Sequence, residues 1–194
     1  MGHADRSDDG LRSDVPGNEA GWLTGARRRP SPNCDERPPG TEICLIVLHN
    51  ISLPPGRFGG DDVERFFTNS LDPAADPFYE QLREVRVSAH LFLRRDGGWV
   101  QFVPFSGRAW HAGVSNWRGR ARCNDFSIGI ELEGTDDLSY TDAQYAALAA
   151  ALESLTACYP IEAITGHSDI APGRKTDPGS AFDWSRIGSP LPRR

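Results

Sequence analysis

The feature that most constrains the fold of this chain is an uninterrupted apolar run, Ile43–Leu48, which ends at His49. A strand over residues 42–50 would carry apolar side chains on both faces, which is typical of a central strand covered on both sides. The run is far too short to cross a membrane. The sequence therefore predicts a buried strand at the centre of a sheet, with an imidazole at its end.

Further strands are expected on either side of this one. Residues 87–93 and 99–105 predict two strands joined by a hairpin turn at Asp96-Gly97-Gly98. A short strand before His167 is also expected. Residues 127–133 alternate strictly between an apolar face (Ile128, Ile130, Leu132) and a polar one (Ser127, Gly129, Glu131, Glu133).

The strongest helix signal covers residues 141–159. Thr141 and Gln144 have the spacing of a capping box, and apolar residues recur at helical spacing: Tyr145, Leu148, Leu152, Leu155. A shorter helix is expected after Asp61, which can cap it. Residues 106–124 predict a long surface loop of the kind that tends to be functional. Mixed strands with about three helices predict the α/β class, a mixed central β-sheet flanked by helices.

Length and composition set the expected domain organisation. At 194 residues one domain is expected: a disordered N-terminal extension over residues 1–20, the domain itself over residues 21–187, and a C-terminal tail over residues 188–194. The net charge of -6, without a basic stripe, argues against nucleic acid as a partner.

The compartment is also predicted from composition. No apolar stretch predicts a membrane span, and residues 1–20 contain none that would suit a secretory signal. The four cysteines are scattered and include no CxxC pair, which favours free thiols over a disulfide framework. We therefore expect a cytoplasmic protein.

Three side chains that can bind a metal stand at or beyond the ends of predicted elements. His49 and His167 each close a strand, and Asp177 follows in a polar loop. Two imidazoles and one carboxylate are the ligand set of a catalytic zinc site with an open fourth position. Each histidine alone is more simply explained as a core residue bonded to a backbone carbonyl, and the spacing forms no compact metal motif. Together the three residues predict a zinc hydrolase.

Two further residues are candidates for chemistry beside such an ion. Glu131 could take a proton from water as a general base, although it could instead face solvent, and Glu133 competes on the same face. Lys175, two residues before Asp177, could stabilise an oxyanion or could be a solvated loop charge.

Other polar residues are candidates for contact with a substrate. His111 follows Trp110 in a Gly-rich loop and suits a sugar or peptide surface. Arg86 and Arg122 could each bind a substrate carboxylate, although single arginines are usually solvated. His90 alternates with apolar residues and is expected to be structural or to support the site residues from behind.

Five stretches of the sequence resemble the cytoplasmic 1,6-anhydro-N-acetylmuramyl-L-alanine amidases of Gram-negative bacteria. The resemblance covers roughly residues 21–187, and matches of this length are highly specific. It is carried by the stretches Leu48–Gly56, Arg86–His90, Arg108–Gly113, Cys123–Thr135 and Gly166–Gly179.

The resemblance implies a fold shared with phage-lysozyme-type amidases and peptidoglycan recognition proteins, and a zinc cofactor. It makes His49, His167 and Asp177 the zinc ligands, Glu131 the base and Lys175 the oxyanion stabiliser. The implied substrate contacts are Asn50, Arg86, Trp110, His111 and Arg122.

The implied reaction is hydrolysis of the amide bond between the lactyl group of (1,6-anhydro-)N-acetylmuramic acid and L-alanine of muropeptides, in cell-wall recycling. No obligate protein partner is expected. Two other functions stay open. A non-catalytic muropeptide-binding module would keep the fold, but the complete ligand set with Glu131 and Lys175 argues against it. A protein-interaction role finds no basic or apolar patch to support it.

Overall fold

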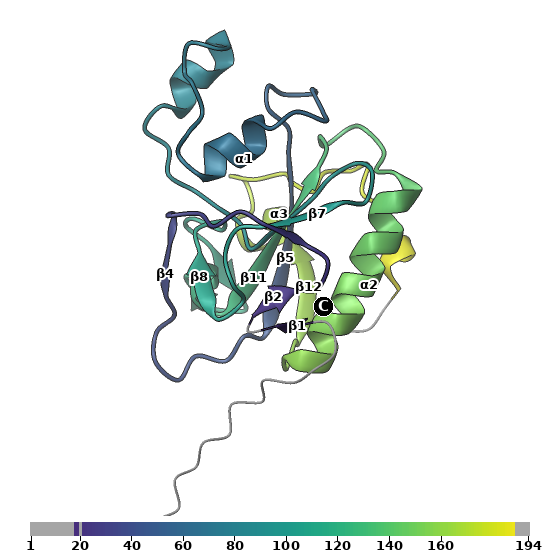
Figure 1. Cartoon of the computed structure of the whole chain (residues 1–194). Coiled ribbons are helices and arrows are strands. Elements are labelled where there is room, and N and C mark those ends of the chain that lie inside the picture. The colour runs from purple at the N-terminus through teal and green to yellow at the C-terminus, as the bar shows by residue number, and fades with distance from the viewer. Residues whose placement is uncertain (1–17, 20, 189–194) are drawn as a thin grey trace, which may run out of the picture.

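The central sheet is built around the apolar run. In the computed structural model, which describes residues 18–19 and 21–188, β5 (Leu45–Ile51) lies between β12 (Ala163–Gly166) and β11 (Ser127–Glu133) and is parallel to both. The strand order is β12-β5-β11-β6-β7-β3. β6 (Leu91–Leu93) is parallel to β11, and β7 (Trp99–Gln101) is antiparallel to β6 and parallel to β3 (Arg27–Arg28). The prediction of a buried central strand is confirmed (Figure 1).

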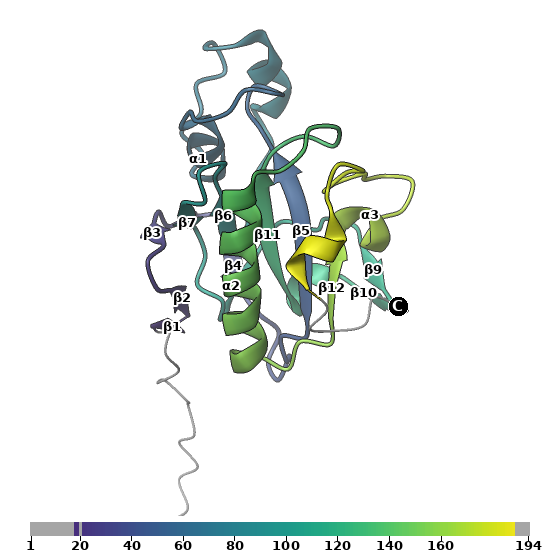
Figure 2. The ribbon, with the colours of Figure 1, turned by 90° about the vertical axis from the view of Figure 1, so that its right-hand side faces the viewer.

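Helix α2 (Asp142–Cys158) covers one face of this sheet (Figures 1 and 2). Its predicted capping box is present, because the Thr141 hydroxyl accepts from the backbone N–H of Gln144 and the Gln144 side chain accepts from that of Thr141. The apolar face of β11 packs in the same cluster as the helix residues Tyr145, Leu148, Leu152 and Leu155. The period-2 pattern of residues 127–133 therefore predicted correctly which side chains share the apolar face, and this face packs with the helix.

The opposite face of the sheet is covered by shorter elements. These are α1 (Asp62–Phe67), the 3-10 turns η1 (Pro77–Leu82) and η2 (Cys123–Asp125), β8 (Gly107–Ala109) paired with β4 (Cys34–Glu36), and the small β9–β10 hairpin (Asn116–Trp117, Arg120–Ala121). Cys44, Leu45 and Val47 of the region around β5 pack here against Ala112 and Phe126. The polar face of β11 is thus enclosed rather than solvated.

Several local predictions were wrong in detail. Strands β6 and β7 are shorter than expected, because the backbone N–H of Ser88 bonds to Trp110 and that of His90 to Gly129 rather than to β7. Asp61 stands before α1 but makes no side-chain cap hydrogen bond. Residues 106–124 form short strands rather than one surface loop, and Ala112 and Cys123 within them are buried.

The remaining elements are short. They are α3 (His167–Ile170), which follows β12 directly, the 3-10 turn η3 (Trp184–Ile187), and the pair β1 (Asn18–Glu19) and β2 (Trp22–Leu23). The predicted N-terminal extension lies outside the described residues except for β1 and the predicted tail except for Gly188, so the domain boundaries stay predictions. None of the helices in residues 18–19 and 21–188 has the length and apolar character needed to cross a membrane.

Candidate metal centre

The carboxyl ends of the parallel strands bring the candidate residues together. His49 of β5 and Glu131 of β11 are direct partners in the parallel register, so their side chains leave the sheet on the same face. His167 comes immediately after β12, the strand on the other side of β5. Sites in sheets with parallel strands form beyond these ends, and residues far apart in the sequence meet here for that reason.

His49, His167 and Asp177 place three donor atoms in a small triangle. The two Nδ1 atoms are 2.9 Å apart, and each lies 3.0 Å from Asp177 Oδ2. All three residues are buried. Among the described residues, these three form a cluster that could hold a metal ion.

The hydrogen bonds of these donor groups are consistent with a bound cation. His167 Nε2 lies 3.0 Å from the carbonyl oxygen of Ala112, which can only accept, so this nitrogen carries a hydrogen, and in the neutral form that binds metals Nδ1 carries none. The lone pair of His167 Nδ1 then faces the carboxylate of Asp177 with no hydrogen between them. Lone pairs this close repel unless a positive charge lies between them. A metal-binding histidine typically donates its other N–H to a carbonyl in this way.

Asp177 is held in place by its own loop. Its carbonyl oxygen accepts from the backbone N–H of Ser168 at 3.0 Å, which ties the loop to the start of α3. The next carbonyl, that of Pro178, accepts from the Tyr140 hydroxyl at 2.8 Å. A Cβ at Gly166 would lie 2.9 Å from the ring of Pro178, so only glycine allows this close approach. These contacts bring the carboxylate back to His167.

Glu131 is buried beside the triangle, and Glu131 Oε2 has no hydrogen-bond partner among the described residues. Burial, and next the charge of Asp177, hold its pKa well above 4.5, while Lys175 acts in the opposite direction. The reading of Glu131 as a solvent-facing residue is therefore wrong. Its competitor Glu133 accepts from the backbone N–H groups of Gly59 and Arg95 and is fully engaged in holding those loops.

An open cleft of about 680 Å³ lies over the centre. Its polar wall includes His49, Glu131, His167, Lys175 and Asp177. Its apolar wall comes from the segment around α1 and η1 and includes Leu53, Phe66, Phe67, Phe78, Leu82 and Val85. This volume suits a ligand of small-molecule size.

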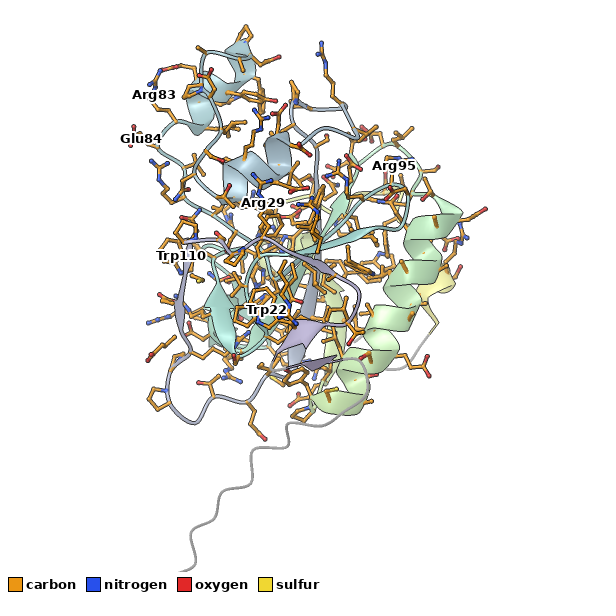
Figure 3. All side chains as sticks on the ribbon, viewed as in Figure 1. Trp22, Arg29, Arg83, Glu84, Arg95 and Trp110 are labelled. Atoms are coloured by element: carbon orange, nitrogen blue, oxygen red, sulfur yellow. The ribbon has the colours of Figure 1, made fainter. Side chains whose placement is uncertain are left out.

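The other predicted contact residues are divided between the cleft and its surroundings. Asn50 and His111 line the cleft, and Asn50 donates to Asp136 at 2.7 Å. Arg86 is exposed and lines a separate hollow of about 50 Å³. Trp110 lies next to β8 (Figure 3), and the exposed Arg122 pairs with Asp125 at 3.2 Å. These three do not line the cleft.

Sequence reasoning missed Arg174, which stands beside Lys175 and also lines the cleft. Its guanidinium donates to the carbonyl oxygens of Ala112 and Val114, at 2.8 and 2.6 Å, and so joins the two loops that flank His167. No periodic pattern marks such a loop residue, because its partners are backbone carbonyls some sixty residues away.

The chain is similar to known proteins over most of its length. Residues 39–180 match the model of the Amidase_2 family, N-acetylmuramoyl-L-alanine amidase. The chain is 62% identical over 171 residues to the 1,6-anhydro-N-acetylmuramyl-L-alanine amidase AmpD of Escherichia coli (strain K12), which covers 87% of this chain and 93% of that protein.

Solved structures give the same relationship. A crystal structure of a Se-Met AmpD derivative superposes with a TM-score of 0.86 at 58% identity, covering 88% of this chain and 96% of that one. The amidase AmiD from E. coli, in complex with the substrate anhydro-N-acetylmuramic acid-L-Ala-D-gamma-Glu-L-Lys, gives a TM-score of 0.56 at 28% identity over 80% of this chain and 64% of that one. The predicted fold class and family are confirmed: the chain belongs to the Amidase_2 family of N-acetylmuramoyl-L-alanine amidases.

Proposed function

We propose that this protein is a zinc-dependent amidase that hydrolyses the bond between the lactyl group of (1,6-anhydro-)N-acetylmuramic acid and L-alanine of muropeptides. The observation that carries the proposal is the triangle of three donor atoms, two nitrogens and one carboxylate oxygen, beside a buried glutamate in an open cleft. The reaction named for the E. coli relative, and the substrate bound in the AmiD complex, support the choice of bond.

His49, His167 and Asp177 would hold the zinc ion through Nδ1, Nδ1 and Oδ2. A zinc ion bound there would act as a Lewis acid and lower the pKa of water toward neutrality, to about 7 in well-tuned sites. The chain's own residues supply the proton transfers and part of the charge stabilisation.

Glu131 accepts a proton from the attacking water, because a carboxylate with a raised pKa is a stronger base. The water oxygen bonds to the lactyl carbonyl carbon, and the ammonium of Lys175 stabilises the resulting oxyanion. Glu131 then returns the proton to the L-alanine nitrogen as the carbon–nitrogen bond breaks. The products are a muramyl carboxylic acid and a peptide with a free amino terminus.

We also propose the substrate contacts. Asn50 and His111 line the cleft and would contact the ligand there. Arg86, Trp110 and Arg122 would contact a substrate that extends beyond the cleft. A raised KM in Arg86→Ala and Arg122→Ala, with kcat unchanged, is the expected result.

The cellular role proposed is recycling of cell-wall fragments in the cytoplasm. The four unpaired cysteines, Cys34, Cys44, Cys123 and Cys158, support a reducing compartment. Native protein recovered from the periplasm with oxidised cysteines would contradict this placement.

The deciding experiment measures zinc content and product masses together. The protein is incubated with defined anhydro and ordinary muropeptides, and products are identified by mass spectrometry. One zinc per chain and release of L-alanyl peptide are expected. Binding of muropeptide without cleavage would favour the non-catalytic module instead. Zinc that persists in a triple variant of His49, His167 and Asp177 would refute the ligand assignment.

A further inference from the structure

Behind the metal centre, a line of buried polar side chains leads from His49 into the interior. His49 Nε2 lies 2.9 Å from His111 Nδ1, and His111 Nε2 lies 3.2 Å from Ser127 Oγ. Ser127 Oγ in turn lies 2.5 Å from the carbonyl oxygen of Cys123. Ser127 is fully buried and does not line the cleft, so among the described residues His111 connects its hydroxyl to the centre.

The carbonyl at the far end sets the direction of each hydrogen bond. A carbonyl oxygen can only accept, so the Ser127 hydroxyl donates its hydrogen to Cys123 and offers lone pairs to His111. His111 Nε2 therefore carries a hydrogen. Between His111 Nδ1 and His49 Nε2, 2.9 Å apart, one nitrogen must donate and the other accept, and a His111 ring with its hydrogen on Nε2 has a lone pair on Nδ1. That atom accepts from His49 Nε2, and the lone pair of His49 Nδ1 is left facing His167 and Asp177.

If these hydrogen bonds ran in the opposite direction, His49 could not bind a metal through Nδ1. If Ser127 donated to His111, then His111 would donate to His49, and His49 would carry its hydrogen on Nδ1, where a metal ligand needs a lone pair. The bond from Ser127 to the Cys123 carbonyl, at 2.5 Å, is much shorter than its 3.2 Å contact with His111. The distances therefore favour the first direction.

The surroundings hold the His111 ring in this position. The side-chain oxygen of Asn124 accepts from the backbone N–H groups of His111 and Ala112, at 3.1 and 2.8 Å. On the sheet side, a Cβ at Gly129 would lie only 2.3 Å from the His111 ring. Residue 129 of β11 is thus a glycine where any side chain would displace the imidazole.

We propose that His111 and Ser127 are positioning residues that fix the tautomer and orientation of His49 as a metal ligand. The proposal rests on the proposed zinc function. Under this proposal, His111 has a structural role besides the substrate contact that the family resemblance implies. Ser127, which no substrate can reach from the cleft, has a structural role as well.

The first test is the zinc affinity of the full-length protein, measured by competition with a chromogenic chelator. Loss of an outer partner of a metal ligand typically weakens metal binding by about 10- to 100-fold. We expect a loss in this range for Ser127→Ala and a larger one for His111→Ala. The matched control is Ser115→Ala. The buried Ser115 hydroxyl accepts from the backbone N–H of Cys123 and donates to Gly113, and it bonds to no histidine among the described residues. The zinc affinity of this variant should equal that of the wild type.

The second test reads the tautomers directly, from the side-chain nitrogen shifts of the histidines by NMR, with and without zinc. In the wild type, His49 should carry its hydrogen on Nε2 in both states. In Ser127→Ala this preference should weaken, while KM at saturating zinc should stay unchanged.

Failure of the proposed zinc function and failure of the positioning role would give different results. A wild-type protein that binds no zinc would remove the proposed function. A wild-type protein that binds zinc, with a Ser127→Ala variant of equal affinity or a His49 that carries its hydrogen on Nδ1, would overturn the positioning role alone.

Discussion

Two buried glutamates on the same face of β11 differ in the hydrogen bonds that their carboxylates make. Glu131 lies in the cleft, and one of its carboxylate oxygens has no hydrogen-bond partner in the part of the chain that the structure describes. Both oxygens of Glu133 accept backbone N–H groups. An unpartnered buried carboxylate is unfavourable for folding and is kept where chemistry needs it. At the scale of single residues, the hydrogen-bond partners decide which glutamate can exchange protons with a substrate.

The first prediction follows from this difference. Glu131→Gln should bind zinc as the wild type does and lose about 100-fold or more in kcat, because general-base catalysis typically contributes that much. Glu133→Gln should lose far less. Zinc content and steady-state kinetics check both variants. Near-normal turnover of Glu131→Gln, together with a collapse in Glu133→Gln, would reverse the assignment.

Lys175 allows a chemical test, because it is the only lysine in the chain and it is exposed on the cleft wall. Acetylation removes the charge that would stabilise the oxyanion, and such a donor typically contributes about 100-fold or more to turnover. We therefore expect amine acetylation to inactivate the enzyme without releasing zinc, and substrate to slow the inactivation. Lys175→Arg has no side-chain amine, so treatment can acetylate only its N-terminus, and the activity that it has before treatment should be retained. Full activity in protein with Lys175 acetylated would argue against the role.

At the scale of elements, the buried carboxylate of Glu64 connects α1, β3 and the end of β6. Glu64 of α1 is fully buried and pairs with Arg27 of β3, with Arg29 at 3.0 Å and with Arg94 at 2.8 Å. Arg94 directly follows β6, so the cluster links α1 to one side of the sheet. Because α1 supplies part of the apolar wall of the cleft, this cluster also shapes the site.

Glu64→Gln should therefore destabilise the protein by about 2 kcal/mol, because Arg94, the least exposed of the three arginines, loses the counter-charge that it faces in the interior. Equilibrium unfolding in urea measures the change. Glu80→Gln is the control, since Glu80 pairs with Arg83 in an exposed turn and such pairs contribute little. Equal stability of the two variants would show that the buried cluster adds nothing.

At the scale of the whole molecule, buried histidines link stability to pH. His90 is fully buried, accepts from the N–H of Gly129 through Nδ1, and has the guanidinium of Arg37 at 3.0 Å from Nε2. Burial, and next the charge of Arg37, lower the pKa of His90 to about 3. The folded protein therefore keeps this ring neutral under conditions in which the unfolded chain protonates it.

The sign of the effect follows from these pKa values. The unfolded state binds a proton at His90 below about 6.5, and the folded state does so only near 3, so stability falls as pH falls through this window. Each pH unit should reduce the free energy of unfolding by up to about 1.4 kcal/mol. His90→Asn can keep the bond from Gly129 without titrating, because its Oδ1 stands at the position of the Nδ1 that accepts it. In metal-free protein its stability should depend less on pH between 6.5 and 4, as urea unfolding at several pH values would show. Parallel pH profiles would contradict the prediction.

The sequence by itself determined the elements and the ligand types. The apolar run at Ile43–Leu48, the alternation over residues 127–133 and the capping box at Thr141 are local patterns, and each formed the element expected because burial and capping act over short spans. The side chains able to bind a metal could be named for the same reason, since their chemistry does not depend on the fold.

Only the tertiary structure decided how these residues meet. The 2.9 Å between the nitrogens of His49 and His167, the burial of Glu131 beside them, and the line through His111 to Ser127 all depend on parallel strands and loops distant in sequence. Arg174 and Ser127 carry no periodic signal of function, because their partners are carbonyls and rings of other segments. Local patterns predict which face a side chain takes, whereas the distances and proton positions of a site are properties of the packed molecule.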